Sequence, residues 1–144
     1  MLANKATLGY KADSGNTYTD LAGLKQIPEM GAEPTLVDNT CLTDAMIMNE
    51  IGIGDAGQLE YVFKFTGYSA GTYKTLYDLL YDATTGAPKN NTVSFQQKMA
   101  DGTTYSFDAQ GSLRVGGGGV NEAIEFTLAL ALQSAIKVGA PAGV

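Results

Sequence analysis

Alternation of apolar and polar positions predicts β-strands through most of the chain. Over residues 58–66, Leu59, Tyr61, Phe63 and Phe65 fall on one side and the intervening side chains on the other. Successive side chains along a strand face its two sides in turn, so this pattern predicts a strand with one buried face. Similar or less regular extended segments are predicted over residues 19–27, 33–40, 92–99, 105–115 and 124–132.

The period of the pattern changes once, near the middle of the chain. The apolar positions there are Tyr73, Leu76, Tyr77, Leu80 and Tyr81. Spacings of three and four residues place them on one face of a helix, with Thr72 as the predicted N-cap and residues 84–88 as the end. Such a helix covers one face of a sheet. We therefore predict a mainly β (α+β) fold, an antiparallel β-sandwich or open barrel with one packed helix, in a single domain spanning residues 1–144.

Residues 41–57 fit neither period. Acidic and apolar side chains are mixed there with glycines at 52, 54 and 57. We interpret the segment as a long irregular loop that makes contacts between subunits, because exposed apolar clusters commonly mark contact surfaces. A loop that packs its apolar residues onto its own domain is the alternative. The predicted contact residues are Met46, Ile47, Met48, Asn49, Glu50, Ile51, Ile53 and Asp55.

The two ends of the chain have weaker patterns. Residues 1–18 predict an N-terminal arm with one short strand, and the Gly- and Pro-containing residues 139–144 predict a flexible C-terminal tail. Asp101-Gly102 lies between two predicted strands and indicates a tight hairpin turn.

The acidic balance of the chain argues against a protein that grips nucleic acid. Nine basic and 15 acidic residues give a net charge of −6, whereas phosphate binding needs Lys and Arg. There is no histidine, so imidazole catalysis and His-ligated metal are excluded, and the single cysteine, Cys41, excludes an internal disulfide. The longest apolar run, residues 128–132, is much shorter than the roughly 20 residues that span a bilayer, so we expect no membrane insertion.

No constellation of residues predicts catalysis. The four glycines at 116–119 lack the following Lys-Ser or Lys-Thr of a phosphate loop, and a hairpin connection fits them better. Cys41 has no histidine to activate it. An acidic group resembles a calcium site but lacks EF-hand spacing; its members are Asp38, Asp44, Glu50 and Asp55. We therefore predict no catalytic, cofactor or metal site and no enzymatic activity.

The order of several segments resembles a known family. Residues 24–44 have a strand, an Ile-Pro-x-Met-Gly-x-x-Pro turn, a second strand and the pattern Asp-x-Thr-x-Leu-x-Asp. These are followed by the Gly-rich end of the loop, the aromatic strand, the helix, the Asp101-Gly102 hairpin and a last strand. Over residues 5–138 this layout resembles the major tail tube proteins of long, non-contractile-tailed phages, a family related in fold to the tubes of contractile tails and of type VI secretion.

This resemblance implies a structural virion protein. Members of the family form hexameric rings that stack into a hollow tube, through which genomic DNA passes without specific binding. The expected partners are other copies of the chain and the tape-measure, tail-tip and tail-terminator proteins, in a virion tail assembled in the host cytoplasm. An acidic lumen would repel phosphate, and its candidate residues are Glu60, Asp108, Glu122 and Glu125. A monomeric β-sandwich that binds carbohydrate or mediates adhesion is the alternative function.

Overall fold

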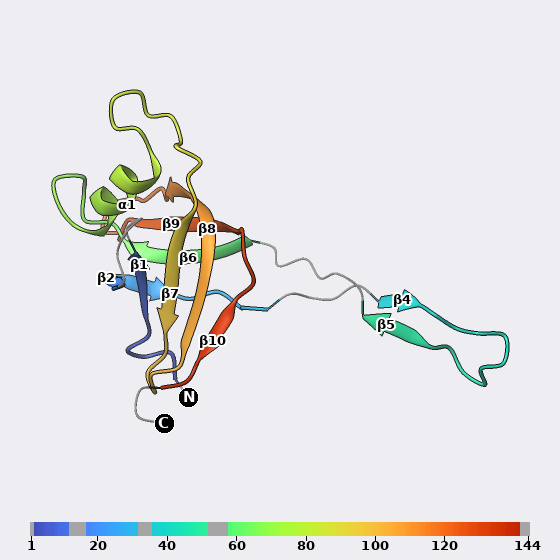
Figure 1. The fold of residues 1–144 in the computed structure, drawn as a ribbon. Helices are drawn as coiled ribbons and strands as arrows, with labels where there is room; N and C mark the ends of the chain where they lie inside the picture. The colour runs from blue at the N-terminus through green and yellow to red at the C-terminus, as the bar shows by residue number, and fades with distance from the viewer. Residues whose placement is uncertain (1, 12–16, 32–35, 52–57, 142–144) are drawn as a thin grey trace.

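The computed structural model describes residues 2–11, 17–31, 36–51 and 58–141. Strands dominate these ranges, and one helix lies between the sixth and seventh strands (Figure 1). The elements are β1 (Thr7–Lys11), β2 (Thr19–Leu21), β3 (Leu24–Gln26), β4 (Leu36–Asp38), β5 (Asn49–Ile51), β6 (Gln58–Lys64), α1 (Thr72–Leu80), β7 (Val93–Lys98), β8 (Thr104–Val115), β9 (Glu125–Leu132) and β10 (Lys137–Gly139).

Eight of these strands form one antiparallel sheet. Its order is β2-β1-β7-β8-β9-β6-β3, with β10 pairing β8 outside this path. The remaining strands, β4 and β5, form a separate two-stranded hairpin. Within the described ranges the sheet does not close into a barrel. The predicted fold, mainly β and antiparallel with one packed helix, is confirmed.

The long strand β8 joins the two halves of the sheet. Its first half pairs with β7 and its second half with β9, and Ala109 is the point where both neighbours meet it, opposite Val93 and Leu132. β10 continues along the β9 side of β8, opposite Tyr105. Figure 1 shows β6 and β9 running across the direction of β1 and β7, so the single sheet folds over its own core.

The core lies inside this fold and combines side chains from both halves of the sheet with two from α1. Its large members are completely or almost completely buried, and each such side chain contributes about 1.5–3 kcal/mol. The core residues are Leu8, Leu21, Leu59, Tyr61, Phe63, Leu76, Leu80, Val93, Phe95, Phe107, Ala109, Phe126, Leu128 and Leu130. The alternation predicted for β6 and β9 is thus confirmed.

The single strand predicted over residues 19–27 is wrong. The structure has two strands there, β2 pairing β1 and β3 pairing β6, at opposite ends of the sheet order. Only Ala22 and Gly23 separate them, and Gly23 has a φ of 84°, which a glycine adopts without strain. The chain therefore changes from one edge of the sheet to the other within two residues.

The helix begins differently from the prediction. Gly71, not Thr72, is the N-cap, and no side chain caps the helix. Thr72 is instead the first helical residue, and its hydroxyl donates to the carbonyl of Ala22 over 2.6 Å. This bond fastens the start of α1 to the turn between β2 and β3.

Both ends of the chain contribute a strand to the sheet. β1 is the short strand predicted within residues 1–18, and its Leu8 is completely buried in the core. Gly139, the first residue of the expected 139–144 tail, belongs to β10. Pro141 lies against Gly102 in the predicted Asp101-Gly102 turn, where Gly102 has a φ of 97°.

Candidate assembly surfaces

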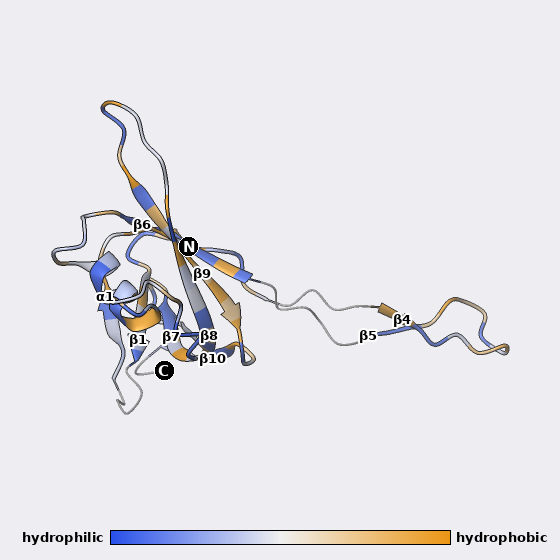
Figure 2. Cartoon of the chain, turned by 90° about the horizontal axis from the view of Figure 1, so that it is seen from above, coloured by the Kyte–Doolittle hydropathy of each residue, from blue (hydrophilic) through white to orange (hydrophobic). Residues whose placement is uncertain are grey.

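The hairpin of β4 and β5, residues 36–51, stands apart from the rest of the described chain, and we call it the arm. It projects away from the eight-stranded sheet in two perpendicular views (Figures 1 and 2). β4 and β5 pair antiparallel, with Val37 opposite Glu50. The prediction of an irregular loop over 41–57 is therefore wrong for Asn49, Glu50 and Ile51, which form β5. Ile53 and Asp55 lie outside the described residues.

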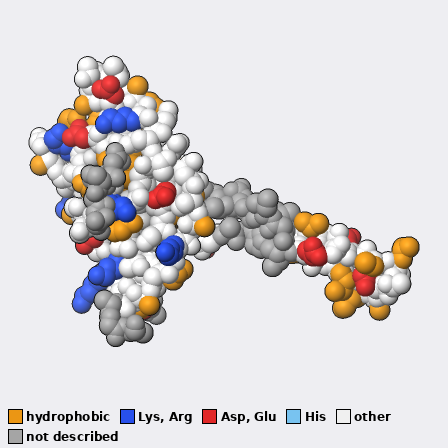
Figure 3. Space-filling model, in the orientation of Figure 1, with side chains coloured by type: hydrophobic (Ala, Val, Ile, Leu, Met, Phe, Trp, Pro, Cys, Tyr) orange, Lys and Arg blue, Asp and Glu red, His pale blue; other side chains and the backbone are white. Residues whose placement is uncertain are grey.

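The described apolar side chains of the arm are mostly in solvent. Met46 is 70% exposed and Ile47 is 73% exposed, and Figure 3 shows hydrophobic and acidic side chains gathered on the projecting hairpin. The other exposed apolar residues on the arm are Leu36, Val37, Leu42 and Met48. Large apolar side chains grouped on one exposed element mark a surface that a partner covers. The alternative, in which these residues pack on their own domain, is not what the structure shows.

Short polar contacts organise the end of the arm. The Thr40 hydroxyl donates to Asp38 Oδ1 over 2.6 Å and accepts from the backbone N–H of Met48 over 2.8 Å. The Cys41 N–H donates to Asp44 Oδ2 over 2.7 Å. The hydrogen bonds from Thr40 lower the pKa of the Asp38 carboxyl, so this carboxylate stays charged at neutral pH. The Asp-x-Thr pattern seen in the sequence thus closes the hairpin.

Three of the four predicted lumen residues lie on the solvent-facing side of the sheet. Glu60 is opposite Ala129, and Glu125 is opposite Lys64, in the ladder between β6 and β9. Asp108 lies in the first half of β8, opposite Ser94 of β7, and accepts a hydrogen bond from the Ser94 hydroxyl over 2.7 Å. Glu122 was expected on a strand, but it precedes β9 in the connection from β8, where its carboxylate accepts from the Gly119 N–H.

The solvent-facing side of β3, β6, β9 and the second half of β8 carries both positive and negative side chains. Lys25 forms an ion pair with Glu125, which also faces Lys64 across the ladder. Arg114 adds a further positive charge opposite Thr127. Small or uncharged residues fill most of the remaining positions, namely Gln110, Ser112, Thr127, Ala129 and Ala131. The surface is therefore nearly neutral, and the lumen role of Glu60, Asp108, Glu122 and Glu125 stays a prediction.

The outer edge of β6 is only partly covered. β3 pairs with Val62 and Phe63 alone, so Gln58 to Tyr61 have no strand partner on that side within the described residues. A wide depression of about 520 Å³ separates this edge from the segment Gln26–Gly31. An open strand edge of this kind offers backbone N–H and C=O groups to a strand of another chain.

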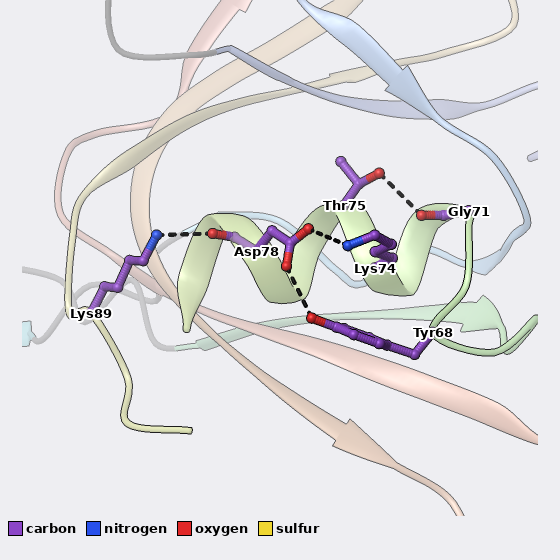
Figure 4. A network of polar contacts seen from close by, with 6 residues as sticks. All are labelled: Tyr68, Gly71, Lys74, Thr75, Asp78 and Lys89. Carbon is purple, nitrogen blue, oxygen red and sulfur yellow. Dashed lines mark hydrogen bonds and ion pairs between the residues drawn. The ribbon is translucent and has the colours of Figure 1, made fainter. Parts of the chain in front are cut away.

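Polar contacts hold the outer side of α1 together (Figure 4). Asp78 accepts from Lys74 over 2.8 Å and from the Tyr68 hydroxyl over 3.1 Å. Lys89 donates to the backbone carbonyl of Asp78 over 2.9 Å. The hydrogen bond from Lys74 is the main cause that lowers the pKa of Asp78. These bonds fix the segments before and after α1 to the helix.

The described part of the chain shows neither a cluster of metal ligands nor a membrane-spanning helix. It contains no group of three or more Cys, Asp or Glu side chains placed to hold a metal ion. The carboxylates of Asp38, Asp44 and Glu50 are each bonded to neighbours within the arm. No helix in the described ranges has the length and apolar character needed to cross a bilayer.

Among known proteins, solved structures match the chain in fold, whereas the sequence comparisons found no match. No protein-family model and no curated protein matches the chain. A chain in the six-fold symmetrised baseplate of the anti-feeding prophage matches with a TM-score of 0.64 and 11% identity, over 100% of this chain and 97% of that one. A chain in the tail of an empty GTA particle with C6 symmetry matches at 0.65 and 18%, over 93% and 95%.

This chain has the fold of tail proteins. A third structure, the sheath/tube terminator of the extracellular contractile injection system PVC, agrees, with a TM-score of 0.58, 7% identity and coverage of 97% and 96%. The resemblance noted in the sequence is therefore confirmed at the level of the fold. Coverage is nearly complete in both directions, so the similarity in fold extends over almost the whole chain.

Proposed function

We propose that six copies of this chain form a ring and that such rings stack into a hollow tail tube through which genomic DNA passes. The observation that carries the proposal is the end-to-end match to chains of tail and injection-system particles, two of them described with six-fold symmetry. In this role the chain is a structural virion protein without catalytic activity. Tape-measure, tail-tip and tail-terminator proteins would be its partners in the tail.

Two surfaces support self-assembly. The arm exposes apolar side chains that a neighbouring copy would cover. The uncovered edge of β6 from Gln58 to Tyr61 would accept a strand from the next copy in a ring, which removes an edge otherwise open to aggregation. A ring with repeated, head-to-tail contacts closes when the rotation between copies allows it.

The solvent-facing side of β3, β6, β9 and the second half of β8 is the surface we assign to the lumen. Its few charges nearly balance, and its remaining side chains are small or uncharged. Such a wall offers DNA phosphates no cluster of cations to bind. Lys64 and Lys25 are both near Glu125, which offsets their attraction for phosphate.

Electron microscopy of the purified protein tests the proposal. We would examine negatively stained samples at rising concentration, with size-exclusion chromatography and light scattering to measure the mass. Cys41 is exposed, so the Cys41→Ser variant is the control for oligomers linked only by disulfides. Hollow tubes or six-fold rings in both proteins are expected. A monomer at every concentration, even after addition of a tail-tip extract, would overturn the proposal and favour a monomeric binding module.

A further inference from the structure

The arm lies within the part of the chain that carries the whole excess of negative charge. Between residues 26 and 63 the sequence has seven acidic residues and no Lys or Arg. The other eight acidic residues are nearly balanced by the nine basic ones, all of which lie outside this segment. In the view of Figure 3 both blue and red side chains lie on the body, whereas the charged side chains visible on the arm are all red.

This charge distribution determines what can cover the arm. Two arms that pack against each other would bring Asp38, Asp44 and Glu50 of both copies together without any cation. Like charges in close contact are unfavourable. The apolar residues of the arm therefore require a surface on the body of another copy, which makes the contact heterologous. Repeated heterologous contacts extend an assembly and do not close a pair.

The body has a groove of matching character beside α1. It measures about 330 Å³ and is lined by Tyr68, Tyr73, Tyr77 and Ala83. The Tyr68 and Tyr77 rings meet edge to face at 5.4 Å, and the Tyr77 ring stacks on Tyr73 at 6.0 Å. The Tyr68 hydroxyl is bonded to Asp78, so the groove is preorganised.

Cations accompany the aromatic walls of this groove. The Lys74 ammonium lies 4.8 Å from the centre of the Tyr68 ring, and Lys89 is bonded to the carbonyl of Asp78 on the same helix (Figure 4). Aromatic rings favour contact with thioether sulfur. The arm presents Met46, Ile47 and Met48 in one exposed run next to its carboxylates.

We propose that the run Met46–Met48 of one copy inserts into the Tyr68/Tyr73/Tyr77 groove of a second copy, with Lys74 and Lys89 near the acidic residues of the arm. This inference rests on the proposed self-assembly and adds the partner surface to it. The groove offers apolar walls, and Lys89 adds a cation beside Lys74, whose own charge is paired with Asp78. The exposed Val115, Val120 and Ile124 at the connection from β8 to β9 form a competing apolar surface.

Photo-crosslinking from Cys41 tests the contact directly. Cys41 is the only cysteine of the chain and is exposed on the arm, so a benzophenone-maleimide attaches there alone. The labelled protein is mixed with an unlabelled Cys41→Ser copy and irradiated, and the crosslinked peptides are mapped by mass spectrometry. We expect intermolecular crosslinks to residues 65–89 of the unlabelled copy.

Substitutions in the unlabelled copy provide the controls. Ala83→Glu places bulk and an acidic group in the groove, and we expect about a tenfold loss of the crosslinked product, equivalent to about 1.4 kcal/mol. Ala100→Glu makes the same substitution at an exposed residue in the turn after β7, outside the groove, and it should retain the product. Circular dichroism of both variants confirms that they are folded.

Three results would overturn the inference. They are crosslinks between two arms, crosslinks to the connection from β8 to β9, and the absence of any intermolecular product. Electron microscopy separates this failure from that of the proposed function: tubes whose crosslinks map elsewhere contradict only the groove, whereas a protein that never forms rings or tubes contradicts the tube itself.

Discussion

The hydroxyl of Tyr61 donates to Oε1 of Gln97 over 2.7 Å inside the core. Tyr61 belongs to β6 and Gln97 to β7, two strands that are separated by β8 and β9 in the sheet. The bond therefore crosses the core between the two halves of the folded sheet. It also explains how a polar glutamine, only 3% exposed, is accommodated in the buried row of β7.

Removal of this hydroxyl should destabilise the monomer. In Tyr61→Phe the ring still fills the core, but Gln97 Oε1 loses its donor, and a buried unpaired polar group costs about 1–3 kcal/mol. Chemical denaturation followed by circular dichroism measures the loss. The double variant Tyr61→Phe/Gln97→Met removes both polar groups and should recover part of it. Equal stability of Tyr61→Phe and the natural chain would show that the bond contributes nothing.

The stability of the natural chain should fall more steeply at alkaline pH than that of this variant. Burial raises the pKa of Tyr61 well above its usual value near 10. The Tyr61 hydroxyl stays protonated in the folded protein but ionises in the unfolded chain. Its contribution to the free energy of unfolding is therefore complete below about pH 10 and is lost as the pH rises further. Burial also raises the pKa of Tyr73, so Tyr61→Phe removes only part of the dependence. Stability measured between pH 8 and 11 should fall less steeply in the variant; parallel curves would contradict the argument.

A methyl group added at Gly111 should disturb the contact between β8 and α1. A Cβ there would lie 2.9 Å from Leu80 Cδ1 and 3.1 Å from Leu130 Cδ2, both of them core side chains. Overpacking of this kind costs about 1–3 kcal/mol. Gly117→Ala is the matched control, because a Cβ at that position meets nothing within 4 Å. Thermal unfolding should therefore show a lower Tm for Gly111→Ala only, and equal Tm values would mean that the helix yields without strain.

Patterns confined to one element predicted the sheet well. The alternation over β6 and β9 gave their buried rows, and the three-and-four spacing gave α1, because both periods follow from backbone geometry alone. The Asp101-Gly102 turn was found for the same reason, since Gly102 supplies the positive φ that the turn needs. These features need no knowledge of the neighbouring elements.

Features that depend on distant partners could not be read from the sequence. Residues 19–27 look like one strand, but β2 and β3, which form within this range, pair with β1 and β6, which lie far apart in the sheet. β4 and β5 have three residues each, too few for a period to emerge, and are defined by their pairing. The place of Thr72 before the helical pattern predicts an N-cap. Its hydroxyl instead bonds to Ala22, a tertiary contact that the local sequence does not reveal.

The candidate site was located in part. The sequence predicted a contact loop over residues 41–57 that includes Met46, Ile47 and Met48. The structure shows these three side chains exposed, but the hairpin that presents them emerged only from the structure, and their contact role stays a prediction. The groove beside α1 was missed, because Tyr73 and Tyr77 were assigned to the helix face that covers the sheet. The presence of Tyr68 four residues before Thr72, outside that face, was the available signal.

Shortening the arm should abolish assembly and leave the monomer intact. Replacement of residues 40–47 by Asn-Gly retains β4 and β5 and joins them by a tight turn. All the removed side chains are exposed, so we expect a change in the free energy of unfolding within about 0.5 kcal/mol. Rings and tubes should disappear in electron micrographs, because the apolar contact to the next copy is lost. Val120→Ser, which removes a 92% exposed apolar side chain from the connection between β8 and β9, should still assemble. Tubes formed by the shortened protein would show that the arm is dispensable and that strand pairing at the β6 edge is sufficient.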